Sequence, residues 1–372
     1  MTLATSSRGP LALGAAVLLA GAPAGAVEPV ERVLIYWMAY DNDLTVLADP
    51  ILDMIEAGVT SPEIVVTVHV DRRGPGGMAR IVITDQGRET TPLPWEEGSA
   101  ELGVLRRELD HVAARHPAAR YGVVFLDHGG RLDEMSHDEH GGASWLDPRH
   151  VAQVLDHWDD THPGALDLVF LQQCGKASLE TLHAFGLAAD TVVASQAVIG
   201  APNFYYTKAL GELSAQPTWS GANLGAAMVR HDRSDMYRTY TVASGSGLAA
   251  LPSHIDPVLA PLLARGSALR WTGGPEPVWT YRGERYLDLF GLLGLLYADN
   301  GLDPEPVETL RAWWDAQVML THQVSPAHPR DAQRLSGATV LLPDAAGGWR
   351  SYADFPLYQQ TQLALVLDRL VR

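Results

Sequence analysis

Two residues of this sequence could together carry out nucleophilic chemistry: a cysteine, Cys174, and a histidine, His128. Cys174 follows a short apolar run, Leu168 to Leu171, and precedes Gly175 and a helical pattern. His128 follows a similar run, from Tyr121 to Leu126. A thiol is a weak nucleophile at its ordinary pKa, and a neighbouring imidazole activates it by taking its proton. The pair points to thiol-dependent acyl transfer if the fold brings the two side chains together.

Buried parallel strands are the elements that would position this pair. Both apolar runs are short and continuous, as in strands that are covered on both faces. Strand-helix-strand repetition predicts right-handed crossovers and a largely parallel sheet. The carboxyl ends of such strands form a ligand crevice, where helix N-terminal amides can stabilise an anion. We therefore expect an α/β fold with His128 and Cys174 at one edge of the sheet.

A purely structural interpretation of the two residues remains open at this point. Free cysteines are often buried as small hydrophobic side chains, and a histidine in a turn needs no catalytic role. Cys174 is the only cysteine of the chain, so no disulfide can form within it. A lone thiol in an oxidising compartment is a liability unless it has a function, so export would favour the catalytic interpretation.

The first 26 residues predict a signal peptide. Arg8 precedes an apolar run from Leu11 to Leu19, and Ala24-Gly25-Ala26 has the small-x-small form of a signal-peptidase site. The run is too short to span a bilayer in the mature protein, and an uncleaved anchor is the alternative. No other stretch reads as a membrane span. We expect an exported protein, either periplasmic or secreted.

Charge and motifs argue against several classes of partner. The formal net charge is −17, and no run of Lys or Arg is present. This balance argues against nucleic acid and anionic membrane surfaces as partners. The strand ends carry neither GxGxxG nor a P-loop, which argues against a nucleotide-dependent enzyme. The sequence gives no indication of the oligomeric state.

A polar loop from Arg131 to Ala143 follows the histidine segment. It contains His137 and His140 in a His-x-x-His pattern, which is weak evidence for a metal site in a polar loop. We expect a solvated loop, suited to an active-site flap or to cleavage, and assign no metal ligands. The acidic composition is compatible with bound Ca²⁺, but no Ca²⁺ site and no other cofactor can be assigned.

Further elements follow from periodicity and turn residues. Expected strands are 32–39, 63–70, an antiparallel return at 79–84, 190–196, 240–247 and 338–342. Expected helices are 47–58, 102–114, 147–158, 178–185, 255–264, 287–296, 310–320 and 363–370. Residues 90–100 are expected to form a loop, and the pattern loosens beyond residue 230.

Taken in order, several segments resemble the clostripain family of cysteine peptidases, which belongs to the structural clan of caspases. The resemblance covers about residues 32–345 and rests on Tyr36–Leu44 with its Asp-Asn-x-Leu turn, Val70-Asp71-Arg72, Asp127-His128-Gly129, Cys174 with Glu180, Ala194–Lys208 and Ser336–Pro343. It implies a caspase-like, mostly parallel sheet with helices on both faces and a C-terminal α+β extension. We expect a signal peptide at 1–26, a catalytic core at 27–230 and a C-terminal region at 231–372.

The resemblance also implies roles for individual residues. His128 would be the general base and Cys174 the nucleophile, in a dyad with no obligatory carboxylate. The backbone N–H groups of Gly129 and Cys174 would form the oxyanion hole. The implied reaction is hydrolysis of a peptide bond through a thioester, with a peptide or protein as substrate.

The sequence departs from the family where the substrate side chain would bind. The family usually has Asp two residues before the cysteine and further acids in the later loop, which favour Arg or Lys before the cut (P1). This chain has Gln172 at the first position and offers Ser195, Gln196 and Asn203 in the later segment. Losing a desolvated ion-pair partner costs about 2–5 kcal/mol. We therefore expect a P1 preference other than Arg or Lys.

Two other functions stay open. One is a catalytically idle binding protein of the cell envelope on the same fold, which the altered pocket residues would explain. The other is a different exported thiol hydrolase, such as an amidase or a transpeptidase-like enzyme. Arg72 or Arg73, after the second strand, could in principle bind an acidic P1 side chain.

Overall fold

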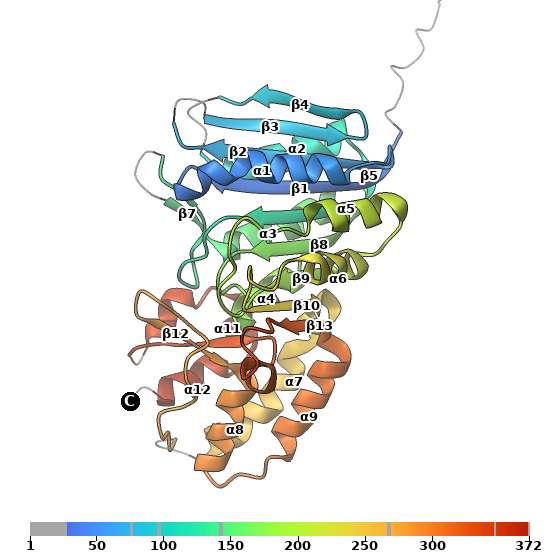
Figure 1. Cartoon of the computed structure of the whole chain (residues 1–372). Helices are drawn as coiled ribbons and strands as arrows, with labels where there is room; N and C mark the ends of the chain where they lie inside the picture. Colours follow the sequence, from blue (N-terminus) through green and yellow to red (C-terminus); the bar gives the residue numbers. More distant parts are fainter. Residues whose placement is uncertain are drawn as a thin grey trace, which may run out of the picture.

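A nine-stranded mixed sheet organises the chain (Figure 1). The computed structural model describes residues 28–74, 77–94, 98–140, 144–265, 269–345 and 347–370, so the predicted signal peptide at 1–26 lies outside the described residues. The strand order is β13-β10-β9-β8-β5-β1-β2-β3-β4. Its members are β1 (Val30–Tyr40), β2 (Ile64–Arg72), β3 (Gly77–Thr84), β4 (Gly87–Pro92), β5 (Ala118–Leu126), β8 (Ala165–Gln172), β9 (Thr191–Ala194), β10 (Thr239–Ser244) and β13 (Met319–Val324).

The centre of this sheet is parallel, as the sequence predicts. Strands β2, β1, β5, β8 and β9 pair in parallel. Antiparallel strands extend both sides: β3 and β4 beyond β2, and β10 and β13 beyond β9. The carboxyl ends of β5 and β8 therefore meet at one edge, which brings the histidine and cysteine segments together.

Alternating residues of β1 show why both faces are covered by helices. Val33, Ile35 and Trp37 pack into one hydrophobic cluster, while Leu34 and Tyr36 pack into another. One face carries α1 (Ala48–Gly58), α5 (Tyr206–Ala215) and α6 (Gly221–His231). The other carries α2 (Leu102–Arg115), α3 (Pro148–Thr161), α4 (Leu179–Gly186) and α7 (Gly245–Ala264). A strand has a side-chain period of two, so a strand that is apolar throughout needs two covering layers.

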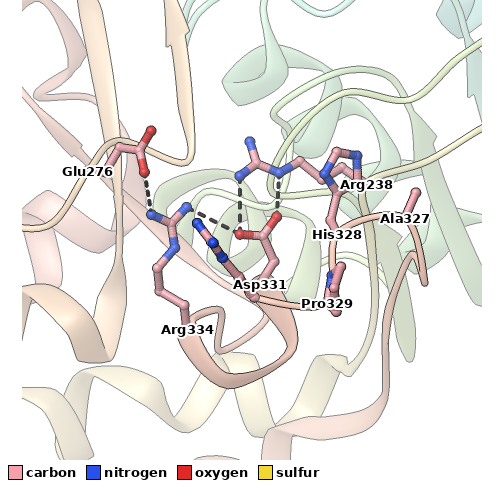
Figure 2. Close-up of a pocket in the computed structure, with 8 residues that line it drawn as sticks. Arg238, Glu276, Ala327, His328, Pro329, Asp331 and Arg334 are labelled. Atoms are coloured by element: carbon pink, nitrogen blue, oxygen red, sulfur yellow. Dashed lines mark hydrogen bonds and ion pairs between the residues drawn. The ribbon is translucent and has the colours of Figure 1, made fainter.

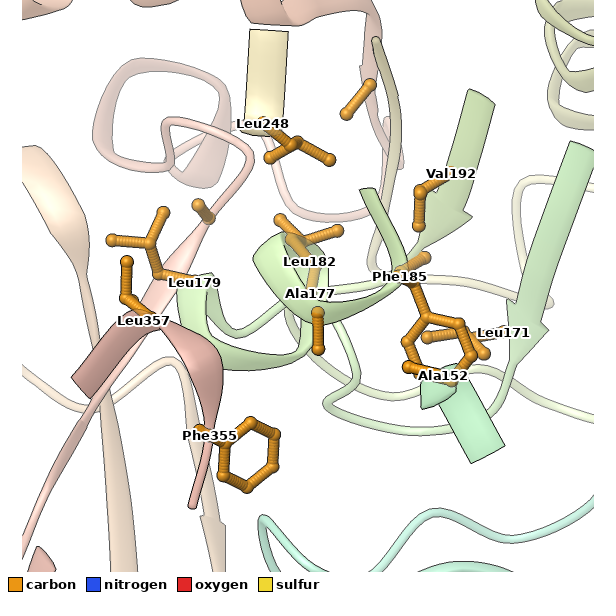
Figure 3. Packing of buried hydrophobic residues seen from close by; sticks show 14 of the residues in the cluster. Ala152, Leu171, Ala177, Leu179, Leu182, Phe185, Val192, Leu248, Phe355 and Leu357 are labelled. Atoms are coloured by element: carbon orange, nitrogen blue, oxygen red, sulfur yellow. The ribbon is translucent and has the colours of Figure 1, made fainter. Parts of the chain in front are cut away.

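Helix α4, which follows Cys174, lies deep in the core (Figure 3). Leu182 lies toward Leu248 of α7, Phe185 lies beside Leu171 of β8, and Leu179 lies beside Leu357 of α11 (Pro356–Gln360). All eight residues of α4 are buried. The segment that carries the candidate nucleophile is therefore anchored by core packing on several sides.

The C-terminal part of the chain extends the main sheet with β10 and β13 and adds a separate small sheet and several helices (Figure 1). A three-stranded sheet joins β11 (Trp279–Tyr281), β12 (Glu284–Asp288) and β14 (Thr339–Leu342). The remaining helices are α8 (Leu289–Asp299), α9 (Glu305–Trp313), α10 (Asp331–Arg334) and α12 (Leu363–Leu370). Strands β10 and β13 belong to the main sheet although both follow residue 230, the expected end of the catalytic core. The main sheet therefore includes residues from both expected regions.

The structure corrects several local expectations. The predicted loop 90–100 begins inside β4, and the polar loop 131–143 contains β6 (Met135–Asp138), which pairs with β7 (Ser144–Leu146). Helix 310–320 instead ends at Trp313, continues as a π-helical turn over Trp314–Val318 and leads into β13. These short polar or mixed segments carry little periodicity of their own; β4 and β6 are strands because each pairs with its neighbour in the chain, β3 and β7 respectively.

Helix α7 also differs from the expectation that no further stretch is apolar enough to span a membrane. By length and composition alone, its 20 residues pass that test. Its Leu248, Ile255, Leu259 and Leu262 are buried in the large hydrophobic cluster. A core helix can satisfy the same criterion, so composition alone does not show a membrane span.

Candidate active site

His128 lies at the carboxyl end of β5, and a carboxylate holds its imidazole. Nε2 of His128 is 2.7 Å from Oδ1 of Asp43, in a pair that is open to solvent on both sides. A carboxylate accepts the hydrogen bond, so this contact assigns the proton to Nε2 and leaves the lone pair on Nδ1. The hydrogen bond from His128 lowers the pKa of Asp43. The imidazole is thereby oriented with Nδ1 available as a base.

Asn42 fixes the turn that presents Asp43. Its Nδ2 donates to Asp127 Oδ1 at 2.8 Å and to the carbonyls of Ala39 at 3.0 Å and His137 at 2.9 Å. Its Oδ1 accepts from the N–H of Leu44 at 2.9 Å, which caps the short helix Asp43–Leu47. Asn42 therefore ties the turn after β1 to the histidine segment after β5.

The turn after β8 holds Cys174 in place. The N–H of Gly175 donates to the carbonyl of Ala197 at 2.9 Å, and the N–H of Ala177 donates to that of Ser195 at 2.8 Å. Gly175 has a φ of +68°, and a Cβ at this position would lie 2.5 Å from Nε1 of Trp279. Glycine is therefore required both by the backbone conformation and by the indole packed against it.

Gly129 packs directly against the backbone of Cys174. A Cβ at Gly129 would lie 2.1 Å from the carbonyl oxygen and 2.9 Å from the nitrogen of Cys174, so only glycine fits. Among the described residues, no backbone carbonyl accepts a hydrogen bond from the N–H of Gly129 or of Cys174, whereas the next N–H, that of Gly130, donates to the carbonyl of Glu134 at 3.1 Å. Two N–H groups that no described backbone carbonyl accepts from thus lie in the packed Gly129 and Cys174 turns, as an oxyanion site requires.

The surroundings of Cys174 favour the neutral form of its thiol. Burial raises its pKa, while a backbone hydrogen bond with Ile199 and the charge of Lys176 act in the opposite direction. Sγ donates to that carbonyl at 3.5 Å, and no hydrogen bond between Cys174 and His128 occurs in the described chain. Catalytic hydrogen bonds are often long in unliganded enzymes and tighten when substrate binds.

Lys176 connects the cysteine turn to the histidine segment. Its fully buried Nζ donates to the carbonyl of Arg131 at 2.7 Å. Burial lowers its pKa to about 8, against the opposing effect of nearby Glu284, Glu134 and Asp133. The sequence analysis did not single out this lysine, although a lysine two residues after a candidate nucleophile could have drawn attention.

Gln172 and Asn203 meet, but inside a closed polar network. Gln172 Nε2 donates to Asn203 Oδ1 at 2.5 Å and to Tyr206 OH at 2.9 Å, and its Oε1 accepts from Tyr205 OH at 2.7 Å. Asn203 Nδ2 donates to Asp232 at 2.7 Å. Both amide side chains are buried, and their hydrogen-bonding capacity is used within the protein.

Ser195 and Gln196 are fully buried and bind other parts of the chain. Ser195 Oγ lies 3.2 Å from Thr239 Oγ1. Gln196 donates to Asp288 Oδ2 at 3.2 Å and accepts from the N–H of Gly337 at 3.0 Å. A substrate could reach these two side chains only after a rearrangement, so their assignment as substrate contacts stays a prediction.

The loop after His128 is more ordered than a solvated flap. Leu132, Met135 and Ser136 are buried, which corrects the expectation of a polar, exposed loop, while residues 141–143 lie outside the described residues. No group of three or more potential metal ligands occurs in the part of the chain that the structure describes. Arg73 pairs with Glu139 of this loop, and Arg72 pairs with Asp49.

Besides Lys176, two functional candidates were not predicted from the sequence, Asp43 and Trp279. Asp43 was interpreted only as part of a turn, although a turn after a parallel strand lies at the same edge as His128. Trp279, from β11 far along the chain, covers Gly175, and its indole N–H is buried without a partner among the described residues. No local signal in the sequence connects residue 279 with residue 175.

Solved structures show the same fold. A secreted C11 cysteine protease from Bacteroides thetaiotaomicron, solved with an irreversible peptide inhibitor, superposes with a TM-score of 0.68 at 16% identity, covering 89% of this chain and 98% of that one. An inactive zymogen C11 protease from Parabacteroides distasonis gives a TM-score of 0.67 at 17% identity, covering 90% and 99%. The expected caspase-like α/β architecture is thereby confirmed.

Sequence comparison identifies the family. Clostripain from Hathewaya histolytica is 25% identical over 145 residues, which span 34% of this chain and only 27% of that protein. The model of the clostripain family, Peptidase_C11, matches residues 36–260, a range that includes both His128 and Cys174. The chain belongs to the clostripain family of cysteine peptidases.

Proposed function

We propose that this protein is a cysteine endopeptidase in which His128 is the general base and Cys174 the nucleophile. The observation that carries the proposal is the close packing of Gly129 on Cys174, whose two N–H groups donate to no backbone carbonyl of the described residues. Asp43 orients the neighbouring imidazole. These are the three parts that thiol-dependent acyl transfer needs: a nucleophile, an oriented base and oxyanion donors.

The reaction would proceed in two steps. Nδ1 of His128 takes the thiol proton, and Sγ of Cys174 attacks the carbonyl carbon of the scissile bond. The oxyanion accepts hydrogen bonds from the N–H groups of Gly129 and Cys174, and the leaving amine departs with the proton from the imidazolium. Water, deprotonated by the same imidazole, then hydrolyses the thioester and restores the thiol.

The proposal includes a P1 preference other than Arg or Lys. No carboxylate stands two residues before Cys174, and the neutral amides of Gln172 and Asn203 are engaged with each other. The carboxylate of Asp232, behind Asn203, accepts hydrogen bonds from Asn203 and Tyr240 and from the N–H of Phe204. A cationic P1 side chain would therefore find no free carboxylate at this position.

Export is also part of the proposal. It is supported by the signal-like composition of residues 1–26 and by the secreted C11 protease of similar fold. Mass spectrometry of the protein recovered from culture medium and from the cell envelope would locate both the protein and its N-terminus.

The decisive experiment is a cleavage profile on a peptide library that is varied at P1, with Cys174→Ala as the control, with and without Ca²⁺. Cleavage that depends on Cys174 and does not favour Arg or Lys supports the whole proposal. Strong Arg or Lys preference would retain the peptidase and reject the altered pocket. Absence of Cys174-dependent cleavage would favour the idle binding protein, and transfer to amines in excess of hydrolysis would favour a transpeptidase-like enzyme.

A further inference from the structure

A polar cavity, which we call the arginine pocket, lies in the C-terminal part of the chain (Figure 2). Its volume is about 400 Å³. The charged and polar groups that line it are Arg238, Glu276, His328, Arg330, Asp331 and Arg334. None of these residues takes part in the reaction proposed above.

Two of the three arginines are held by carboxylates within the pocket. Asp331 accepts from Arg238 Nε at 2.6 Å and from its second guanidinium nitrogen at 3.2 Å, and it pairs with Arg334 at 3.3 Å. Burial opposes ionisation of Asp331, but the hydrogen bond and charge of Arg238 hold its pKa below the ordinary value. Arg334 also pairs at 2.8 Å with Glu276, whose side chain is 81% exposed. Figure 2 shows these pairs converging on Asp331.

Arg330 is the third arginine of the pocket. Within the described part of the chain, no carboxylate pairs with its guanidinium, and the residue is exposed. Three guanidinium groups face two carboxylates, so the pocket carries an excess positive charge in a chain whose formal net charge is −17. The exposed imidazole of His328 adds a further polar group. The pocket is therefore suited to bind a ligand that carries one carboxylate, because a guanidinium binds a carboxylate in a planar, bidentate manner.

Sheet topology places the arginine pocket at the edge of the sheet where β5 and β8 end, next to His128 and Cys174. β10 is antiparallel to β9, and β13 is antiparallel to β10, so β10 begins and β13 ends at the edge where β8 ends. Arg238 immediately precedes β10, and His328 lies four residues beyond Val324, the last residue of β13. With strands about 4.8 Å apart, the start of β10 lies roughly 10 Å from the end of β8.

Direct contacts connect the pocket to the two segments that flank Cys174. The N–H of Arg238 donates to the carbonyl of Val198 at 3.0 Å, one residue from the carbonyl that accepts from Sγ of Cys174. A guanidinium nitrogen of Arg238 donates to the carbonyl of Val278 at 3.2 Å. The next residue, Trp279, packs against Gly175. An extended peptide advances about 3.3 Å per residue, so a residue about three positions from the cut would reach the pocket.

We infer that the arginine pocket is a substrate subsite that binds an Asp or Glu side chain about three residues from the scissile bond. The substrates would then be acidic peptides. This inference rests on the proposed peptidase function, since it places the peptide across the edge that carries Cys174. Arg330 supplies the charge, while Arg238, Asp331 and Arg334 form the frame of the pocket.

The test uses peptide pairs with one cleavable bond, in which each position up to four residues on either side carries Glu or Gln. We expect Glu to raise kcat/KM over Gln about fivefold at a position near the third, because an ion pair at a partly exposed site contributes modestly. The gain should arise through KM and should shrink in high salt. Arg330→Gln should abolish it. Arg88→Gln, which removes the same charge from β4 at the opposite side of the sheet, should retain it.

A binding measurement keeps the two proposals separable. Cys174→Ala protein should bind the Glu peptide about fivefold more tightly than its Gln partner, and the double variant Cys174→Ala/Arg330→Gln should bind both equally. Equal cleavage and equal binding of Glu and Gln peptides by proteins that retain Arg330 would overturn the inference, as would a Glu preference that survives Arg330→Gln. If neutral peptides are still cleaved in that case, the peptidase function stands without the acidic subsite. Selective binding without cleavage would overturn the peptidase function alone.

Discussion

The carboxylate of Asp43 and the imidazole of His128 form a hydrogen-bonded pair, with Oδ1 and Nε2 2.7 Å apart. The two residues are 85 positions apart in the sequence and meet because β1 and β5 are adjacent parallel strands. The family resemblance implied a dyad without an obligatory carboxylate. In the mechanism proposed for this chain, Asp43 is a third group that fixes the tautomer of His128 and would stabilise the imidazolium formed when the thiol is deprotonated.

Replacing Asp43 by Asn tests this relationship. An amide in this position no longer favours the Nε2–H tautomer, so we expect kcat to fall roughly tenfold with little change in KM. The loss should be smaller than in a buried triad because both side chains are open to solvent. Asp49→Asn, which removes an exposed carboxylate paired with Arg72, is the matched control and should leave kcat unchanged. Equal kcat for Asp43→Asn and the native protein would remove Asp43 from the mechanism.

Adding a methyl group at Gly129 should strongly reduce peptidase activity. The added Cβ would lie 2.1 Å from the carbonyl oxygen of Cys174, so the two segments must separate and both oxyanion donors shift. We expect Gly129→Ala to reduce kcat at least about a hundredfold. Gly103→Ala is the control, because nothing lies within 4 Å of the new methyl group on α2, and alanine favours a helix. A folded Gly129→Ala protein with near-native kcat would reject Gly129 as an oxyanion donor.

Lys176 should make stability depend on pH in a defined window. Its pKa is about 8 in the folded protein and 10.5 as the ordinary value, so between these values the unfolded chain binds a proton that the folded chain does not. Stability therefore rises with pH in this window, by roughly 2 kcal/mol between pH 8 and about 9.5, relative to a variant without the amine. Urea unfolding of the native protein and Lys176→Met at several pH values measures this difference.

Lys208→Met provides the matched control for that series, since Lys208 is exposed on α5. The difference between the native protein and this control should stay constant across the same pH range. Parallel curves for native protein and Lys176→Met would mean that the Lys176 amine titrates alike in the folded and unfolded chain.

Gln172 should stabilise the fold, whatever its part in specificity. Gln172→Met keeps the volume but leaves Tyr205 OH and Asn203 Oδ1 without their buried partner. We expect the free energy of unfolding to fall by about 2–3 kcal/mol. Gln216→Met removes an exposed amide that accepts from Trp219 and should cost much less. If Gln172→Met keeps full stability and instead changes P1 preference, Gln172 contacts the substrate and the network opens during binding.

The sequence analysis was most accurate where one segment contained its own signal. The apolar runs of β1, β5 and β8 and the helices that start near residues 147 and 178 are local features, and the structure confirms them. The predictions were least accurate for β4, β6 and the π-helical turn after α9, because these short segments carry no clear period of their own; β4 and β6 are strands through hairpin pairing with β3 and β7.

The sequence alone determined the fold class, the edge of the sheet that carries His128 and Cys174, and the absence of an acid two residues before the cysteine. These follow from residue type and from the rule that parallel strands end at a common edge. The tertiary structure decided which polar groups are available at that edge. In the packed structure, Gln196 is buried against the C-terminal part of the chain, and Gln172 is hydrogen-bonded to tyrosines. Asp43 is hydrogen-bonded to His128, and the arginine pocket lies at the edge of the sheet that carries Cys174. Such pairings cannot be read from spacing, because each joins residues that only the packed sheet brings within hydrogen-bonding distance.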